Sequence, residues 1–125
     1  MTSAQKQRSV ILVVEDVEET RYGIERLLTT SGYRVTTARG EEEAVCKAIF
    51  EPPDLVLISL GLDAPRILPV VERIRAGIGK DEEVPVVVFC VASLEEGVEV
   101  AAGHNVYMTR PDNFDQLRAL IGRLL

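Results

Sequence analysis

The chain has 125 residues, of which 46% are hydrophobic and 27% charged, and its formal net charge is −6. This length suits one domain with a single core, and the composition is that of an ordinary globular protein. The negative charge argues against direct binding to nucleic acid, because phosphate backbones are neutralised by Lys and Arg. No apolar run approaches the roughly 20 residues of a membrane span, and the amino terminus lacks the apolar core of a signal peptide. We therefore expect a cytoplasmic protein with no membrane contact.

Five segments are predicted to be strands. Unbroken apolar runs are typical of strands that are buried on both faces of a parallel sheet, and four segments have this character: Val10–Val14, Leu55–Ser59, Val84–Val91 and Val106–Thr109. The stretch Tyr33–Ala38 alternates more and is rich in β-branched residues, which favours an edge strand. The run that ends at Ser59 is the most apolar and is expected at the centre of the sheet.

Five segments are predicted to be helices. Asp16 and Glu19 have capping-box spacing and open the first helix. Ser93 and Glu96 repeat that spacing and predict a short helix that closes before Gly103. Two further predicted helices follow Gly40 and the loop at 62–65. The last predicted helix has Phe114 as the first residue of its apolar stripe.

The alternation of strands and helices predicts an α/β fold with a doubly wound parallel sheet and right-handed crossovers. In such sheets the crevice beyond the carboxyl ends of the strands is the usual place for ligands and chemistry. The polar residues at or just beyond these ends are expected to gather on one rim: Glu15, Asp16, Ser59, Cys90 and Arg110. The two cysteines, Cys46 and Cys90, are too few for a disulfide framework, and we expect both to be free thiols.

Four stretches together resemble the receiver (CheY-like) domain of two-component response regulators: Ile11–Asp16, Pro53–Ile58, Val84–Val88 and Tyr107–Pro111. The resemblance covers the chain from about Ser9 onward. It implies a flavodoxin-like fold with five strands in the order 2-1-3-4-5 and five helices. It also implies a signalling module, not an enzyme, that accepts a phosphoryl group from a histidine kinase onto an aspartate beside Mg²⁺.

The resemblance assigns a role to each residue of the rim, and several of these residues depart from the family. The acidic pair falls on Glu15 and Asp16 and is retained. The phosphoacceptor position falls on Ser59, and the position of the lysine that steadies the phosphoryl charge falls on Arg110. The two switch positions, a hydroxyl and an aromatic residue in the family, fall on Cys90 and Tyr107.

These departures predict a degenerate receiver that acts by protein–protein interaction without aspartyl phosphorylation. Ser59 offers a neutral hydroxyl that attacks only if a base removes its proton. Arg110 favours a bidentate carboxylate, so we expect an ion pair with Glu15 or Asp16. No cofactor is expected beyond weak Mg²⁺ binding at Glu15 and Asp16. Two alternatives remain open: a receiver that uses Ser59 or Asp63 as acceptor, and an unrelated small α/β binding protein or enzyme.

The expected domain covers residues 9–125, preceded by a disordered or extended tail at 1–8. The resemblance places the partner surface over Ser93–Arg123, for a histidine kinase, an output protein or a second copy of the chain. From Cys90 to Arg110 the chain is about two residues shorter than family members usually are, so we expect a trimmed fourth helix or leading loop. Because the last predicted helix ends the chain, output is expected to come from a partner or from a longer protein.

Overall fold

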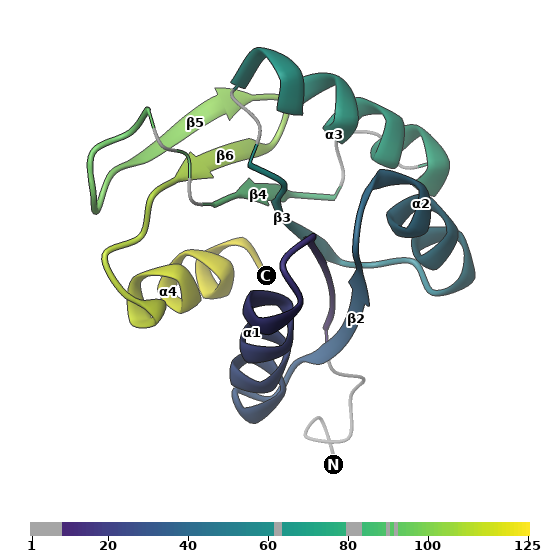
Figure 1. The fold of residues 1–125 in the computed structure, drawn as a ribbon, viewed down its shortest axis with the longest axis horizontal. Coiled ribbons are helices and arrows are strands. Elements are labelled where there is room, and N and C mark those ends of the chain that lie inside the picture. Colours follow the sequence, from purple (N-terminus) through teal and green to yellow (C-terminus); the bar gives the residue numbers. More distant parts are fainter. Residues whose placement is uncertain (1–8, 62–63, 80–83, 90, 92) are drawn as a thin grey trace.

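A computed structural model describes residues 9–61, 64–79, 84–89, 91 and 93–125. One sheet lies between two pairs of helices (Figure 1). The strands are β1 (Val10–Glu15), β2 (Arg34–Ala38), β3 (Leu55–Ser59), β4 (Val86–Val88), β5 (Glu99–Gly103) and β6 (Val106–Thr109). The helices are α1 (Glu18–Thr30), α2 (Glu41–Phe50), α3 (Ala64–Ile78) and α4 (Phe114–Leu124). In this part of the chain, each helix is too short or too polar to cross a lipid bilayer.

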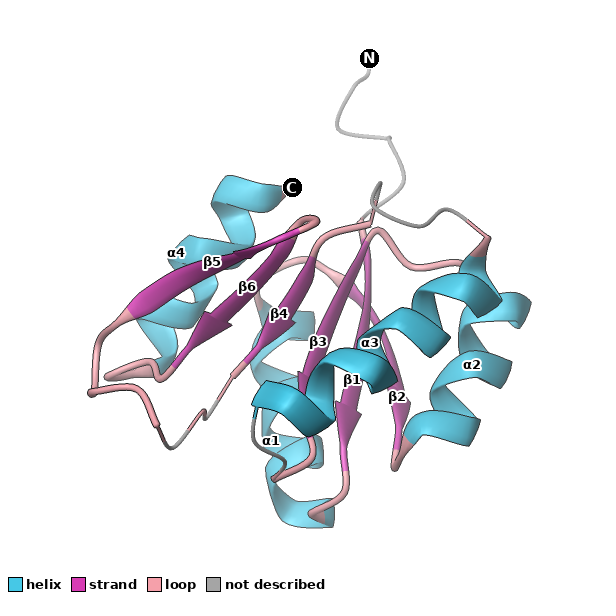
Figure 2. Cartoon of the chain, turned by 90° about the horizontal axis from the view of Figure 1, so that it is seen from above, coloured by secondary structure: helices cyan, strands magenta, loops and turns pink. Residues whose placement is uncertain are grey.

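The sheet has six strands in the order β2-β1-β3-β4-β6-β5. The first five strands of that order are parallel, and they reproduce the predicted order 2-1-3-4-5 with β6 as the predicted last strand. The prediction of a flavodoxin-like sheet with β3 at its centre and β2 at one edge is therefore confirmed. An additional strand, β5, pairs antiparallel with β6 and forms the other edge (Figure 2).

The core has two layers, one on each face of the sheet. Pairing β3 between β1 and β4 buries Leu55, Val56, Leu57 and Ile58 completely, which explains why this run carries no polar residue. Helices α2 and α3 cover one face and α1 and α4 cover the other, as the views in Figures 1 and 2 show. Each fully buried Leu or Ile contributes about 1.5–3 kcal/mol by leaving water.

The predicted short helix over Ser93–Gly103 is wrong, because the second half of this stretch is β5. Gly97, with φ of +87°, donates its N–H to the Arg110 carbonyl at 2.7 Å, and the Arg110 N–H donates to the Val98 carbonyl at 3.2 Å. Two residues thus oppose one, the pattern of a β-bulge that begins with a left-handed glycine. The described residues consequently contain four helices, where five were predicted.

A two-residue turn joins β5 to β6. Both of its residues, His104 and Asn105, have positive φ (54° and 62°), which matches the twist of the flanking strands in a tight hairpin. Asn tolerates this conformation better than most residues, so Asn105 favours the turn locally. The side chain of His104 is exposed there, far along the sheet from the rim where chemistry was expected.

Arg75 holds the end of α3 against this hairpin. Although it is an arginine, it is only 6% exposed. Its guanidinium donates to the carbonyls of His104, Val84 (2.6 Å) and Asn105 (2.9 Å). One side chain therefore connects α3, the start of β4 and the β5–β6 turn.

Helix α1 begins one residue later than predicted, with its N-cap at Val17 instead of Asp16. Val17 makes no side-chain cap, so the predicted capping box from Asp16 to Glu19 does not form. The Glu15 carboxylate accepts the N–H of Val17 at 3.0 Å instead. A residue that the sequence assigns to the rim thus also supports the start of a helix.

Glu41 on α2 forms an ion pair with Arg73 on α3, and this contact should make stability depend on pH. Hydrogen bonds from Arg73 hold the pKa of Glu41 below its ordinary value. A carboxyl with a lowered pKa stabilises the fold above its unfolded pKa of about 4.3, and this contribution is lost as pH falls through the folded value. We expect Glu41→Gln to lower the thermal midpoint at neutral pH and to leave it unchanged at a pH below both values. Equal effects at the two pH values would contradict this.

Candidate functional site

The carboxyl ends of β1 and β3 bring the first site residues together. Glu15 and Ser59 are direct neighbours in the parallel register, each being the last residue of its strand. Glu15 is 4% exposed and Ser59 is half-buried, whereas Asp16 lies just beyond β1 and is exposed. The structure therefore places the acidic pair beside the position where the resemblance puts the phosphoacceptor.

Glu15 is a buried carboxyl with a crowded surrounding. Burial raises its pKa, and the hydrogen bond from the Val17 N–H opposes that rise. The adjacent Asp16 carboxyl raises the pKa of Glu15 further, and a hydrogen bond with Ser59 lowers it; the net direction is upward. Two carboxyls side by side disfavour one another's charge, as expected where a cation or a proton is needed to balance them.

Arg21, on the first turns of α1, reaches back to the same end of β1, and the sequence did not indicate it. Its guanidinium donates to the Glu15 carbonyl at 2.9 Å and is partly buried. The donor satisfies a strand-end carbonyl and places a positive charge near the acidic pair. An arginine one turn into a helix is usually solvated, so no sequence pattern distinguishes this one.

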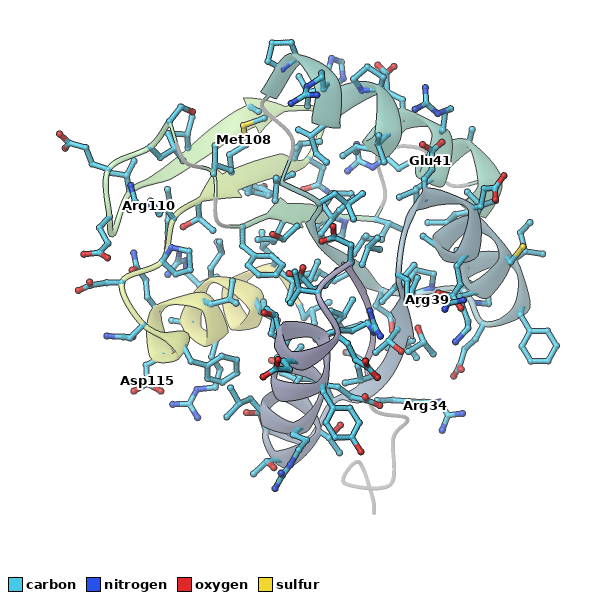
Figure 3. The ribbon with its side chains drawn as sticks, in the orientation of Figure 1. Arg34, Arg39, Glu41, Met108, Arg110 and Asp115 are labelled. Carbon is cyan, nitrogen blue, oxygen red and sulfur yellow. The ribbon has the colours of Figure 1, made fainter. Side chains whose placement is uncertain are left out.

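Arg110 does not make the ion pair expected of it. Its guanidinium donates to the Leu94 carbonyl at 3.2 Å, and among the described residues no ion pair joins it to Glu15 or Asp16. In Figure 3 it lies beside the chain that leads into β5, away from α1. The sheet order explains this, since three strand spacings, about 14 Å, separate the end of β6 from that of β1.

The remaining rim positions lie on or near β6. The hydroxyl of Thr109, a residue that is 1% exposed, donates to the Val98 carbonyl at 3.0 Å and is thereby committed to the β5–β6 hairpin. Tyr107 is half-buried and pairs with Ala101 across the hairpin. The predicted switch position Cys90 and the alternative acceptor Asp63 lie outside the described residues.

The donors at the rim are of the kind that Mg²⁺ prefers, because Glu15 and Asp16 supply carboxylate oxygens and Ser59 a hydroxyl oxygen. The carboxylate of Glu15 already accepts the Val17 N–H and interacts with Ser59. The Ser59 hydroxyl is neutral, whereas the family resemblance would place a charged aspartate carboxylate at this position. Glu15 and Asp16 would hold the ion, whose chemistry when bound would be to balance negative charge at the rim.

Comparison with known proteins supports the fold and the class. No model of a known protein family matches the chain. The transcriptional regulatory protein KdpE of Staphylococcus aureus is 34% identical over 116 residues, which are 91% of this chain and 48% of KdpE. The receiver domain of the hybrid histidine kinase CckA superposes with a TM-score of 0.67 at 25% identity, covering 93% of this chain and 98% of that domain.

A third relative contains a metal. The receiver domain of the sensor histidine kinase PA1611 from Pseudomonas aeruginosa has a TM-score of 0.69 at 26% identity, with 94% of this chain and 97% of that domain covered. That structure has a magnesium ion coordinated in its active-site cleft. The chain spans about half the length of the curated relatives it matches.

The sheet order, the acidic pair at the end of β1 and these similarities define a response-regulator receiver (CheY-like) domain. It differs from the predicted form of that class by the strand β5, which stands where a fourth helix was expected.

Proposed function

We propose that this receiver domain is a signalling module that works by binding partner proteins and is not phosphorylated on an aspartate. The observation that carries the proposal is the residue at the end of β3. Ser59 stands in register with Glu15 and interacts with its carboxylate, so a neutral hydroxyl occupies the place where a phosphoacceptor aspartate would stand.

The surroundings of Ser59 support the loss of phosphoryl transfer. A serine hydroxyl is a weak nucleophile unless a base of suitable pKa removes its proton. The sole histidine of the chain, His104, lies in the β5–β6 turn at the opposite end of the sheet. Arg110, the residue at the lysine position, donates to Leu94. The acceptor is thus replaced, no histidine lies near Ser59 among the described residues, and the residue at the lysine position bonds elsewhere.

The same geometry supports weak magnesium binding at most. Glu15 and Asp16 provide two carboxyls, and burial together with the adjacent Asp16 raises the pKa of Glu15. The missing third charge lowers the electrostatic attraction for a divalent ion. We therefore assign Mg²⁺ no required part in the function.

The proposed partner surface is the predicted one, Ser93–Arg123, in the form that the structure gives it. It consists of β5, β6 and α4, with an exposed strand in place of the expected helix. A histidine kinase, an output protein or a second copy of the chain are the partner classes implied by the receiver fold. Ser59 lies outside this surface, and in the proposed function binding there does not require phosphorylation.

The proposal is tested by incubating the protein with acetyl phosphate and Mg²⁺ and measuring its intact mass. We expect no adduct with the mass of a phosphoryl group, while a receiver that retains its aspartate is labelled in a parallel reaction. A stoichiometric adduct that hydroxylamine removes would contradict the proposal, since this lability is that of an acyl phosphate. An adduct that resists hydroxylamine and is lost in Ser59→Ala would favour Ser59 as the acceptor.

A further inference from the structure

The β5 strand forms one edge of the sheet. It pairs with β6 on one side, the sheet order ends with it, and all five of its residues are exposed (Figure 2). An edge strand presents main-chain N–H and C=O groups that can pair with another strand. Proteins usually block such an edge with proline, lysine, a β-bulge or a covering element. The sequence Glu99–Gly103 contains no proline or lysine, and its bulge lies between Ala101 and Gly103, beyond the regularly paired part from Glu99 to Ala101.

The register shows which main-chain groups point outward. The Arg110 N–H donates to Val98, so Val98 faces β6. Antiparallel ladders alternate, and Val100, which lies opposite Met108, therefore bonds to β6 as well. The N–H and C=O groups of Glu99 and Ala101 consequently point away from the sheet. Glu99 and Ala101, one on each side of Val100, thus supply two N–H and two C=O groups that make no ladder bond to β6.

The side chains along this edge are compatible with close approach of another strand. Ala101 and Ala102 are small, Gly103 has no side chain, and Val100 exposes 42% of its surface on the face covered by α2 and α3. Glu99 is the single charged residue of β5. Its carboxylate accepts a hydrogen bond from Arg123 of α4 at 2.7 Å, so its charge is already balanced.

We propose that β5 is an interface at which two copies of this chain pair antiparallel about a two-fold axis beside Val100. In this register Glu99 lies opposite Ala101 of the second copy, and the reverse pair is identical. The four outward groups of each strand then form four interstrand hydrogen bonds. Val100 meets Val100 of the second copy in the close, non-hydrogen-bonded position, where a β-branched pair is stabilising.

A second copy fits this edge better than a foreign strand for two reasons. The pairing is self-complementary, which is the requirement for a two-fold interface. It also places the two Glu99 side chains diagonally, about 7–8 Å apart on the α4 face, where each already has its own Arg123.

The pairing is expected to be weak and to respond to salt. Few residues on each side take part, and interfaces of small area are transient. Each copy carries a net charge of −6, so long-range repulsion opposes association at low ionic strength. Added salt should therefore strengthen the dimer. This interface lies within the proposed partner surface, but its formation does not depend on the state of Ser59.

Sedimentation equilibrium over a range from micromolar to millimolar protein tests the proposal. We expect the mass to rise from 13.8 kDa toward twice that value, and to rise further with salt. Ala101→Pro removes an outward N–H while sparing the ladder to β6 and should keep the protein monomeric. Ala101→Val, which keeps that N–H at the same position, is the matched control and should dimerise. A monomer at all concentrations, or undiminished association of Ala101→Pro, would overturn the proposal.

A second pair of variants covers the case in which Ala101→Pro disturbs the fold. Val100→Lys places two charges opposite one another at the axis and should abolish association, whereas Val100→Thr should retain it. Amide exchange gives a readout without mutation, because the Glu99 and Ala101 amides should become protected as concentration rises while Val100 is protected throughout. Concentration-independent exchange at Glu99 and Ala101 would argue against the interface. Acetyl phosphate labelling is a separate measurement, so failure of either proposal is recognised independently.

Discussion

Replacing Arg75 with methionine is expected to lower the free energy of unfolding by about 3 kcal/mol, because hydrogen bonds from a charged donor contribute about 1.5–3 kcal/mol each and some of the freed carbonyls regain water. Methionine keeps the apolar stem but removes the group that bonds to His104, Val84 and Asn105. Urea denaturation followed by circular dichroism measures the loss, and the m-value should stay constant.

Arg73→Met is the matched control for this experiment. Arg73 lies on the same helix, but its side chain is 58% exposed and its partner is Glu41, so its loss should cost much less. Arg75→Lys should recover only part of the stability, since an ammonium group lacks the planar fork that reaches several carbonyls. If Arg75→Met were no more destabilising than Arg73→Met, the hydrogen bonds between Arg75 and the hairpin would not contribute to the free energy of unfolding.

Ser59→Asp is expected to convert the rim into a magnesium site. In the presence of a chelator the third carboxylate beside Glu15 and Asp16 should destabilise the fold by about 2 kcal/mol through like-charge repulsion. Mg²⁺ should reverse that loss, because an ion that binds only the folded state stabilises it by mass action. Thermal unfolding with and without Mg²⁺ measures both effects, and we expect at least about a tenfold gain in Mg²⁺ affinity over the natural chain, equivalent to 1.4 kcal/mol.

Ser59→Asn separates charge from size in this experiment. Asparagine is nearly isosteric with aspartate and neutral, so it should show neither the loss in chelator nor the response to Mg²⁺. Ser59→Asp should also accept a hydroxylamine-labile phosphoryl group from acetyl phosphate, although slowly, because Arg110 donates to Leu94. A Mg²⁺ response in the natural chain equal to that of Ser59→Asp would contradict the role assigned to the missing carboxylate.

The parallel part of the fold could be predicted because its physical signal is local. A strand buried on both faces must be apolar throughout, so β1, β3 and β4 are recognisable from their residues alone, and the alternating β2 is recognisable as an edge. The carboxyl ends of parallel strands share one side of a sheet. The strand order therefore predicts that Glu15 and Ser59 lie close together, and the register confirms that they are neighbours.

The stretch before β6 was mispredicted because two signals compete there. Ser93 and Glu96 have the spacing of a helix start, but Val98 and Val100 alternate with a polar residue as in a strand. Pairing with β6 decides the outcome, and Gly97 makes it possible by adopting the positive φ that the bulge requires. Pairing with a neighbouring strand is not visible in the residue pattern of β5 alone.

The charged residues were the least predictable part of the site. Arg75 and Arg21 resemble solvated helix arginines in sequence, yet both donate to main-chain carbonyls at strand ends or turns. Arg110 was expected to form an ion pair with a carboxylate, but the path of the chain places the Leu94 carbonyl within hydrogen-bond distance of its guanidinium. Side-chain partners of this kind depend on where a loop runs, which composition and spacing do not specify.

The β5–β6 hairpin is fastened at both of its ends. Arg75 holds the turn to α3, and the bulge at Gly97 together with the Thr109 hydroxyl holds the opposite end. Any displacement of the strand that carries Tyr107 would have to rupture these bonds together. Under the function proposed above, the domain would present one constant shape to its partners, so the signal would depend on its amount and location, as for a fixed adaptor, instead of on a change between two conformations.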